Sequence, residues 1–286
     1  MTDLTDARHL VRQARERKEA GDTAGAESAY LAAVQASPEW FVPLYNLGLL
    51  YKYQGRWKES LELYRRAVVL APGDEDAWWN LGIAATAVGD WHEARRAWSA
   101  CGMQPPAGDG PPNYHFGSVP VRLDPTGRGE VVWAERMDPA RARLENIPLP
   151  WSDYNWGDVV LHDGAAEGYR VVDGTQYPVF NALALLIPSG ATKYVVELAT
   201  SDRGAVDTLL SVASSMGGAA EDWGSSTRIL CRECSLGVAH DHPERDPSPA
   251  HPHCGLAARD DAHAQSVIDA WLSSHPGADL VRWYAA

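Results

Sequence analysis

Hydrophobic residues in the first hundred positions follow a pattern that repeats every 34 residues. In the second unit of this pattern, apolar residues recur at helical spacing over residues 42–54 and 57–70, with a turn at Gly55 between them. The same period separates Pro38, Pro72 and Pro106, and also Gly21, Gly55 and Gly89. The pattern predicts three helix–turn–helix units over residues 1–106. Because one such unit cannot bury its apolar face alone, we expect the three to stack into a short solenoid.

The recurring residues form a recognisable series. The second unit carries Leu44, Leu47, Gly48, Tyr51, Gly55, Trp57, Ser60, Tyr64, Ala67 and Pro72, and the third carries Trp78, Leu81, Gly82, Ala85, Gly89, Trp91, Ala94, Trp98, Cys101 and Pro106. The first unit is degenerate but keeps Gly21, Ala26, Tyr30, Ala33 and Pro38. This series resembles the tetratricopeptide repeat (TPR) family. The resemblance implies that Gly48 and Gly82 let paired helices approach closely, and that aromatic residues such as Tyr64 and Trp98 fill the core.

The family's geometry also implies a concave groove lined by the first helix of each repeat. We expect a protein partner, as a peptide or a helix, to contact Arg12, Arg15, Tyr45, Asn46, Leu49, Lys52, Tyr53, Trp79, Asn80 and Ile83. Asn46 and Asn80 fit a clamp for a peptide's C-terminal carboxylate, but the third repeat offers no Lys or Arg on that face. General peptide or helix binding is therefore the favoured interpretation.

A Pro- and Gly-rich linker is expected at residues 107–116, and the periodicity changes after it. Short alternating runs between Gly, Pro and Asp residues over 117–190 predict a small, bent, β-barrel-like sheet. Two short segments there, Glu145-Asn-Ile-Pro-Leu-Pro and Trp156-Gly-Asp-Val-Val-Leu, follow a strand-like run that begins at Glu130. They resemble a small bacterial domain of uncharacterised function with an "NIP" segment before a "GDVV" strand. The resemblance implies a fold more than an activity.

The remaining residues, 191–286, predict an α+β domain. Strands are expected at 193–200, 226–230 and 280–284, and amphipathic helices at 203–216 and 262–273. The whole chain is thus expected to be multidomain, with an all-α TPR solenoid followed by an α+β region.

A cysteine–histidine cluster interrupts this last domain. Cys231-x2-Cys234 is followed, after sixteen residues, by His251-x2-Cys254, which is a spacing typical of two-knuckle zinc sites. The intervening loop has little apolar content, so a metal would give it a reason to be ordered. The sequence therefore predicts a structural zinc held by Cys231, Cys234, His251 and Cys254. His240, His242 and His253 compete as ligands, and the spacing leaves open whether the site is closed or has an open, catalytic position.

Charge and motifs narrow the choice of function. The net charge is −13, of which residues 1–106, with 12 Lys/Arg and 14 Asp/Glu, account for only −2. This acidity argues against a nucleic-acid surface, which needs a basic stripe. The chain shows no dinucleotide, phosphate-loop or nucleophile-elbow motif, and His162-Asp163-Gly164 is interpreted as a turn rather than a catalytic pair.

The expected compartment is the cytoplasm. No apolar run reaches the roughly 18 residues of a membrane span, and the first residues lack the order of a secretory signal. The preference for Arg over Lys favours a bacterial source.

The sequence favours a protein-interaction adaptor or regulatory scaffold rather than an enzyme. The alternative is an enzyme or small-molecule-binding protein whose C-terminal α/β domain carries the active site.

Overall fold

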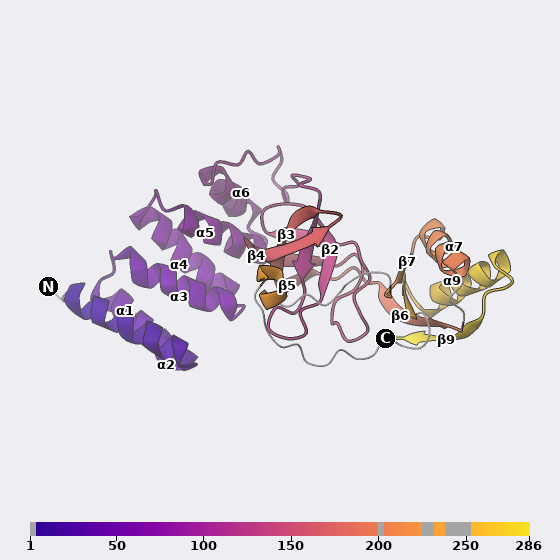
Figure 1. The fold of residues 1–286 in the computed structure, drawn as a ribbon. Coiled ribbons are helices and arrows are strands. Elements are labelled where there is room, and N and C mark those ends of the chain that lie inside the picture. Colours follow the sequence, from indigo (N-terminus) through magenta and orange to yellow (C-terminus); the bar gives the residue numbers. More distant parts are fainter. Residues whose placement is uncertain (1–3, 200–202, 225–231, 238–252) are drawn as a thin grey trace. The chain divides into compact units, whose positions relative to one another are not determined.

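The computed structural model describes residues 4–199, 203–224, 232–237 and 253–286. The chain divides into two compact units, Met1–Tyr114 and His115–Ala286 (Figure 1), and each is described by itself. None of the described helices combines the length and the apolar character that a membrane crossing requires.

The described part of the first unit consists of helices that pack in consecutive pairs. They are α1 (Leu4–Glu19), α2 (Thr23–Ala36), α3 (Phe41–Tyr53), α4 (Trp57–Leu70), α5 (Glu75–Val88) and α6 (Trp91–Ala100). Local chemistry explains their ends. Asp22, Asp74 and Asp90 cap the N-termini of α2, α5 and α6 by accepting a backbone N–H in the first turn. Gly89 ends α5 in the left-handed conformation, which a residue without a β-carbon adopts without strain. The predicted helical repeats are confirmed.

Aromatic rings fill the space left by two helical glycines. A β-carbon added to Gly82 would lie 2.5 Å from the ring of Trp98, and one added to Gly48 would lie 2.9 Å from the ring of Tyr64. Both rings are fully buried. The two contacts lie at equivalent positions of successive repeats. Both repeats therefore pack an aromatic ring of the second helix against a glycine of the first.

The second unit begins with a closed barrel. Its strands are β1 (Ser118–Arg122), β2 (Val131–Arg136), β3 (Arg141–Leu144), β4 (Val159–Val172) and β5 (Thr175–Ile187). Successive strands pair antiparallel, and β1 closes the sheet by pairing parallel to β5. Alternate side chains fill the interior, including Val121, Val132, Ala142, Leu144 and Val160.

A four-stranded antiparallel sheet follows the barrel. It comprises β6 (Thr192–Leu198), β7 (Ala219–Asp222), β8 (His253–Ala258) and β9 (Leu280–Ala285), in the spatial order β7-β8-β6-β9. Helices α7 (Arg203–Ser215) and α9 (Asp261–Ser274) cover one face, as Figure 1 shows. Apart from the short helix α8 (Arg232–Leu236) between β7 and β8, the β-α-β-β-α-β order with this strand arrangement is the split βαβ arrangement of ferredoxin-like folds. The sequence analysis missed β7 and β8, and the strand it expected at 226–230 lies outside the described residues.

The segment containing the "NIP" motif joins the barrel to this sheet. The Asn146 side chain accepts a hydrogen bond from the Trp133 backbone N–H (2.7 Å) and donates one to Glu221 on β7 (2.8 Å). The Ile147 backbone N–H donates to the second Glu221 oxygen (2.7 Å), and the Trp223 indole donates to the Ile147 carbonyl (2.9 Å). The motif therefore has a structural role, because it fixes two sheets that are far apart in the sequence.

His162 lies inside the barrel wall. Its side chain is fully buried, its ring centroid is 5.1 Å from that of Phe180, and its Nδ1 accepts the Gly164 backbone N–H at 3.0 Å. Gly164 has a positive φ of 72° at an irregularity of β4. Burial, and to a lesser extent the positive charge of Arg136, lower the pKa of His162 to about 3. The imidazole is therefore neutral and enclosed, and it lies inside strand β4, where the sequence pattern had predicted a turn.

The glycine contact predicts the effect of overpacking. Gly82→Leu places a side chain where the Trp98 ring lies, so we expect the first unit to lose at least about 1–3 kcal/mol of unfolding free energy. Urea denaturation followed by circular dichroism measures the loss. Gly73→Leu is the control, because nothing lies within 4 Å of the β-carbon position at Gly73. Equal stability of the two variants would contradict the packing described above.

Burial of His162 predicts that acid weakens the barrel. An unfolded histidine takes up a proton near pH 6.5, whereas the folded pKa is about 3, so the stability contribution is present above pH 6.5 and is lost as the pH falls. We expect His162 alone to lower the free energy of unfolding by up to about 1.4 kcal/mol for each pH unit below roughly pH 6. Denaturation at several values between about pH 4 and 8 should give a shallower decline for His162→Gln than for wild type. His92→Gln, at an exposed position of α6, should keep the wild-type slope.

Candidate partner-binding groove

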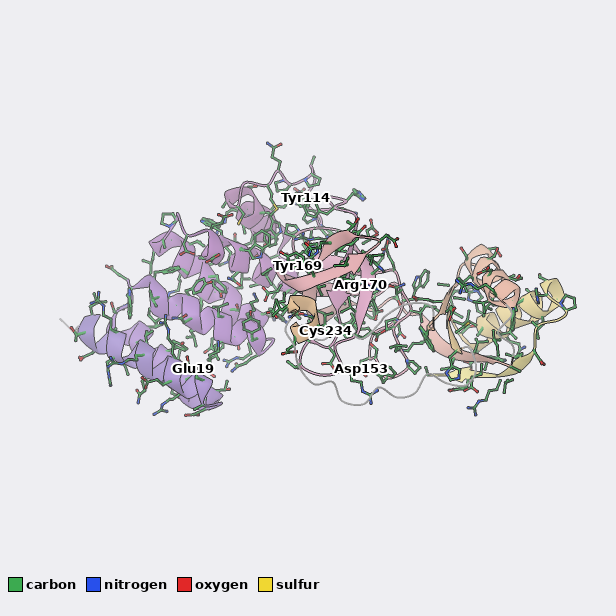
Figure 2. All side chains as sticks on the ribbon, in the orientation of Figure 1. Glu19, Tyr114, Asp153, Tyr169, Arg170 and Cys234 are labelled. Carbon is green, nitrogen blue, oxygen red and sulfur yellow. The ribbon has the colours of Figure 1, made fainter. Side chains whose placement is uncertain are left out.

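The predicted groove residues lie on the first helices of the three pairs. Arg12 and Arg15 are on α1. Helix α3 carries Tyr45, Asn46, Leu49, Lys52 and Tyr53, and α5 carries Trp79, Asn80 and Ile83. Helices α3 and α5 contact each other directly, so their facing side chains meet. Figure 2 shows the side chains along these helices.

A polar contact lies between α3 and α5. The Lys52 ammonium donates a hydrogen bond to Asn80 Oδ1 at 2.9 Å. The Asn80 amide nitrogen donates to the Asp76 carbonyl (2.8 Å) and lies 3.5 Å from the Tyr45 hydroxyl. The structure therefore brings Tyr45, Lys52 and Asn80 together from neighbouring repeats.

The residues expected to contact a partner differ in how deeply they are buried. Lys52 is only 3% exposed and Ile83 is fully buried, so neither is an open surface contact as the sequence analysis expected. Trp79 is half-buried and meets Trp98 edge-on, with ring centroids 5.3 Å apart. Tyr53, in contrast, is 58% exposed. The more deeply placed residues hold the repeats together.

Asn46 and Leu49 are both half-buried on α3. The side-chain nitrogen of Asn46 is enclosed and has no hydrogen-bond partner among the described residues. Such a donor costs about 1–3 kcal/mol when it stays unpaired, so an acceptor that reached it would be favoured.

The α1 end of the groove is cationic. Arg12 and Arg15 are exposed, and Arg12 Nη2 lies 3.0 Å from His9 Nδ1. Arg15 also lies near the Tyr30 hydroxyl. Burial raises the pKa of the Tyr30 hydroxyl, while the Arg15 charge opposes that rise. Along the predicted groove, exposed guanidinium groups lie on α1, and aromatic and amide groups lie on α3 and α5.

The predicted metal ligands are only partly visible. Cys231 and His251 lie outside the described residues, as do the competing His240 and His242. Cys234 lies half-buried on the short helix α8 (Arg232–Leu236), which packs against β4. Among the described residues, no group of three or more Cys, His, Asp or Glu side chains is arranged to hold a metal ion.

Cys254 has a different environment from Cys234. It lies on β8 within the core beneath α7 and α9 and is fully buried. Burial raises the pKa of its thiol to about 12, which opposes the thiolate that zinc binding needs. His253 faces the other side of the strand, with Nε2 3.9 Å from a Glu197 oxygen. The structure therefore does not bring Cys234 and Cys254 into one described site.

Sequence reasoning also missed a buried lysine. Lys193 on β6 is 4% exposed, and its ammonium donates to the backbone carbonyls of Leu149, Ser152 and Tyr154. Two features of the sequence could have indicated that Lys193 is buried. It lies in an apolar strand, and the chain has only four lysines. A lysine at such a position needs internal acceptors.

Two comparisons with known proteins found similar sequences or structures for the first unit. Residues 48–89 match the family model described as TPR repeat. Similar solved structures include a mutant O-GlcNAc transferase of Thermobaculum terrenum, which is 29% identical over 34% of this chain and 19% of its own, with a TM-score of 0.31. The second TPR of Spaghetti (RPAP3), bound to an HSP90 peptide, is 17% identical over 34% of this chain and 91% of its own, with a TM-score of 0.33. MamA is 22% identical over 35% of this chain and 54% of its own, with a TM-score of 0.32.

The comparison with curated proteins found no match. The chain spans about a fifth of the length of the transferase. The residues that match the TPR model, 48–89, include the end of α3 and the whole of α4 and α5, which are consecutive helices of the repeats.

Proposed function

We propose that this chain is a protein-interaction adaptor or regulatory scaffold, and that its TPR groove binds a peptide or a helix of a protein partner. The observation that carries the proposal is the arrangement along α1, α3 and α5. Exposed Arg12 and Arg15 on α1 and half-buried Tyr45 on α3 and Trp79 on α5 supply the contact groups, and the buried Lys52–Asn80 bond joins α3 to α5.

The chemistry of this surface favours a partner segment with both acidic and apolar groups. Guanidinium groups form bidentate, charge-assisted hydrogen bonds with carboxylates. Half-buried rings, such as those of Tyr45 and Trp79, supply apolar area at low conformational cost. Residues 1–106, which form the three repeats, have almost no net charge. An acidic partner segment is therefore repelled less by the repeats than by the rest of the chain.

We also propose that the segment around Cys231 and Cys234 binds a structural zinc. The C-x2-C spacing supports this, since two thiolates at that spacing share one tetrahedral ion. The buried environment of Cys254 favours histidine over this cysteine for the remaining positions, and His240, His242, His251 and His253 are the candidates.

Reversing the exposed charges tests the groove. Arg12→Glu combined with Arg15→Glu should weaken partner binding by roughly tenfold or more, because charge-assisted contacts contribute about 1.5–3 kcal/mol each. The partner is first captured from lysate of the source cells and identified, and its affinity for each variant is then measured by titration calorimetry.

Lys58→Glu combined with Arg66→Glu is the matched control. Both residues are exposed on α4, a second helix of its repeat, so the charge change is the same and the groove is intact. Equal affinity of the two double variants would move the interface away from α1. Lys52 is not part of the test, because its buried bond to Asn80 supports the repeats.

The zinc proposal predicts metal content. Purified wild-type protein should carry about one zinc per chain, and Cys234→Ser should reduce this to background. Elemental analysis by mass spectrometry gives the ratio, with Cys101→Ser, on the first unit, as the control. Cys254→Ala should retain the metal. Wild-type protein without zinc would contradict the proposal.

A further inference from the structure

The second unit contains a small pocket that is lined by residues of this unit alone. It has a volume of about 240 Å³ and lies between the segment that follows β1 and the loop that precedes β4. The lining residues used below are Asp124, Arg128, Glu130, Trp151, Asp153 and Tyr154. Figure 2 labels Asp153 on the loop between β3 and β4. Pockets for drug-sized ligands measure about 300–1,000 Å³, so this one has room for a group the size of one side chain.

Hydrogen bonds hold the walls of this pocket in place. The buried Lys193 ammonium donates to the carbonyls of Leu149 and Ser152 at 2.8 Å and of Tyr154 at 3.2 Å, which fixes the loop from behind. The Leu149 backbone N–H donates to Glu130 Oε1 at 2.9 Å. On the opposite wall, Asp124 Oδ2 accepts the backbone N–H of Arg128 at 3.0 Å. The backbone on both sides of the pocket is therefore held in place by hydrogen bonds.

The lining is negatively charged. Asp124, Glu130 and Asp153 contribute three carboxylates to the lining, and Arg128 contributes one guanidinium. Burial raises the pKa of the Tyr154 hydroxyl, and the nearby charges of Asp153 and Asp124 raise it further. Lys193 offsets one negative charge, but its ammonium is directed at the loop carbonyls. The negative electrostatic potential of these carboxylates favours a cation in the pocket.

Arg128 shows which cation suits the pocket. Its guanidinium carbon lies 4.7 Å from the ring centroid of Trp151, which is a cation–π arrangement. Trp151 is 47% exposed, so its indole is accessible from solvent. We propose that the pocket binds a guanidinium-bearing ligand, which stacks on Trp151 in place of Arg128 and pairs with the carboxylates beside it. Arg128 then acts as an internal competitor for the site.

Calorimetric titration of the full chain with N-butylguanidinium tests this proposal. We expect saturable binding, with an affinity roughly tenfold or more above that for the neutral N-butylurea, since the charge supplies both the cation–π and the carboxylate interactions. Trp151→Ala and Asp153→Asn should each weaken binding several-fold. Arg128→Ala should strengthen it, because the internal competitor is absent.

The controls separate this effect from nonspecific attraction and from misfolding. Asp207→Asn removes the same charge at an exposed position of α7 and should leave the affinity unchanged. Trp151 and Asp153 are exposed, so their variants should unfold like the wild type in thermal melts. Binding that is absent from both wild type and Arg128→Ala, equal for the urea, or unaffected by Asp153→Asn and Trp151→Ala would overturn the proposal.

A second titration distinguishes two sources of the guanidinium group. The probe is the blocked peptide acetyl-Gly-Arg-Gly-amide. Tighter binding of this peptide than of N-butylguanidinium indicates an arginine side chain of a partner protein. Weaker or equal binding of the peptide indicates a free small guanidino compound.

Discussion

The geometry of the repeats depends on two positions that have no side chain. At Gly48 and Gly82, an aromatic ring of the following helix lies 2.9 Å and 2.5 Å from where a β-carbon would be. The rings thereby set the separation of the helices in each pair. That separation determines where α3 and α5 lie, and hence whether Lys52 can reach Asn80 across the repeat boundary at 2.9 Å. The groove surface is a consequence of this packing.

Buried and half-buried polar groups play the corresponding part in the second unit. A buried charge is stable only when it is paired or hydrogen-bonded, so each such group allows few arrangements of its surroundings. Glu221 accepts bonds from Asn146 and Ile147, which fixes the sheet against the barrel. Lys193 donates to three carbonyls and gives the loop before β4 its shape. The same loop forms one wall of the pocket, so the shape of that wall follows from a structural lysine.

The local sequence pattern was sufficient to predict the helices of the repeats. It was insufficient to predict contacts between residues that are far apart in the sequence. The 34-residue period located the helices, because glycine, aromatic and proline positions recur with it. Periodicity identifies the face on which a residue lies but not its depth, so the burial of Lys52 and Ile83 was missed. Strand β7 has only four residues, and β8 begins inside the segment interpreted as a zinc knuckle. The role of Asn146 was not predictable, since its partner Glu221 is 75 residues away.

Charge distinguishes the two recognition surfaces. The groove presents exposed arginines in a region of nearly zero net charge, whereas the pocket presents carboxylates and aromatic rings in the acidic remainder of the chain. A partner segment that suits one is therefore repelled by the other. The two surfaces share no residue and lie in different units, so occupancy of one does not compete directly with occupancy of the other. In the proposed adaptor, opposite charge preferences therefore allow two ligands of different chemistry to be bound without exchange between the two proposed sites.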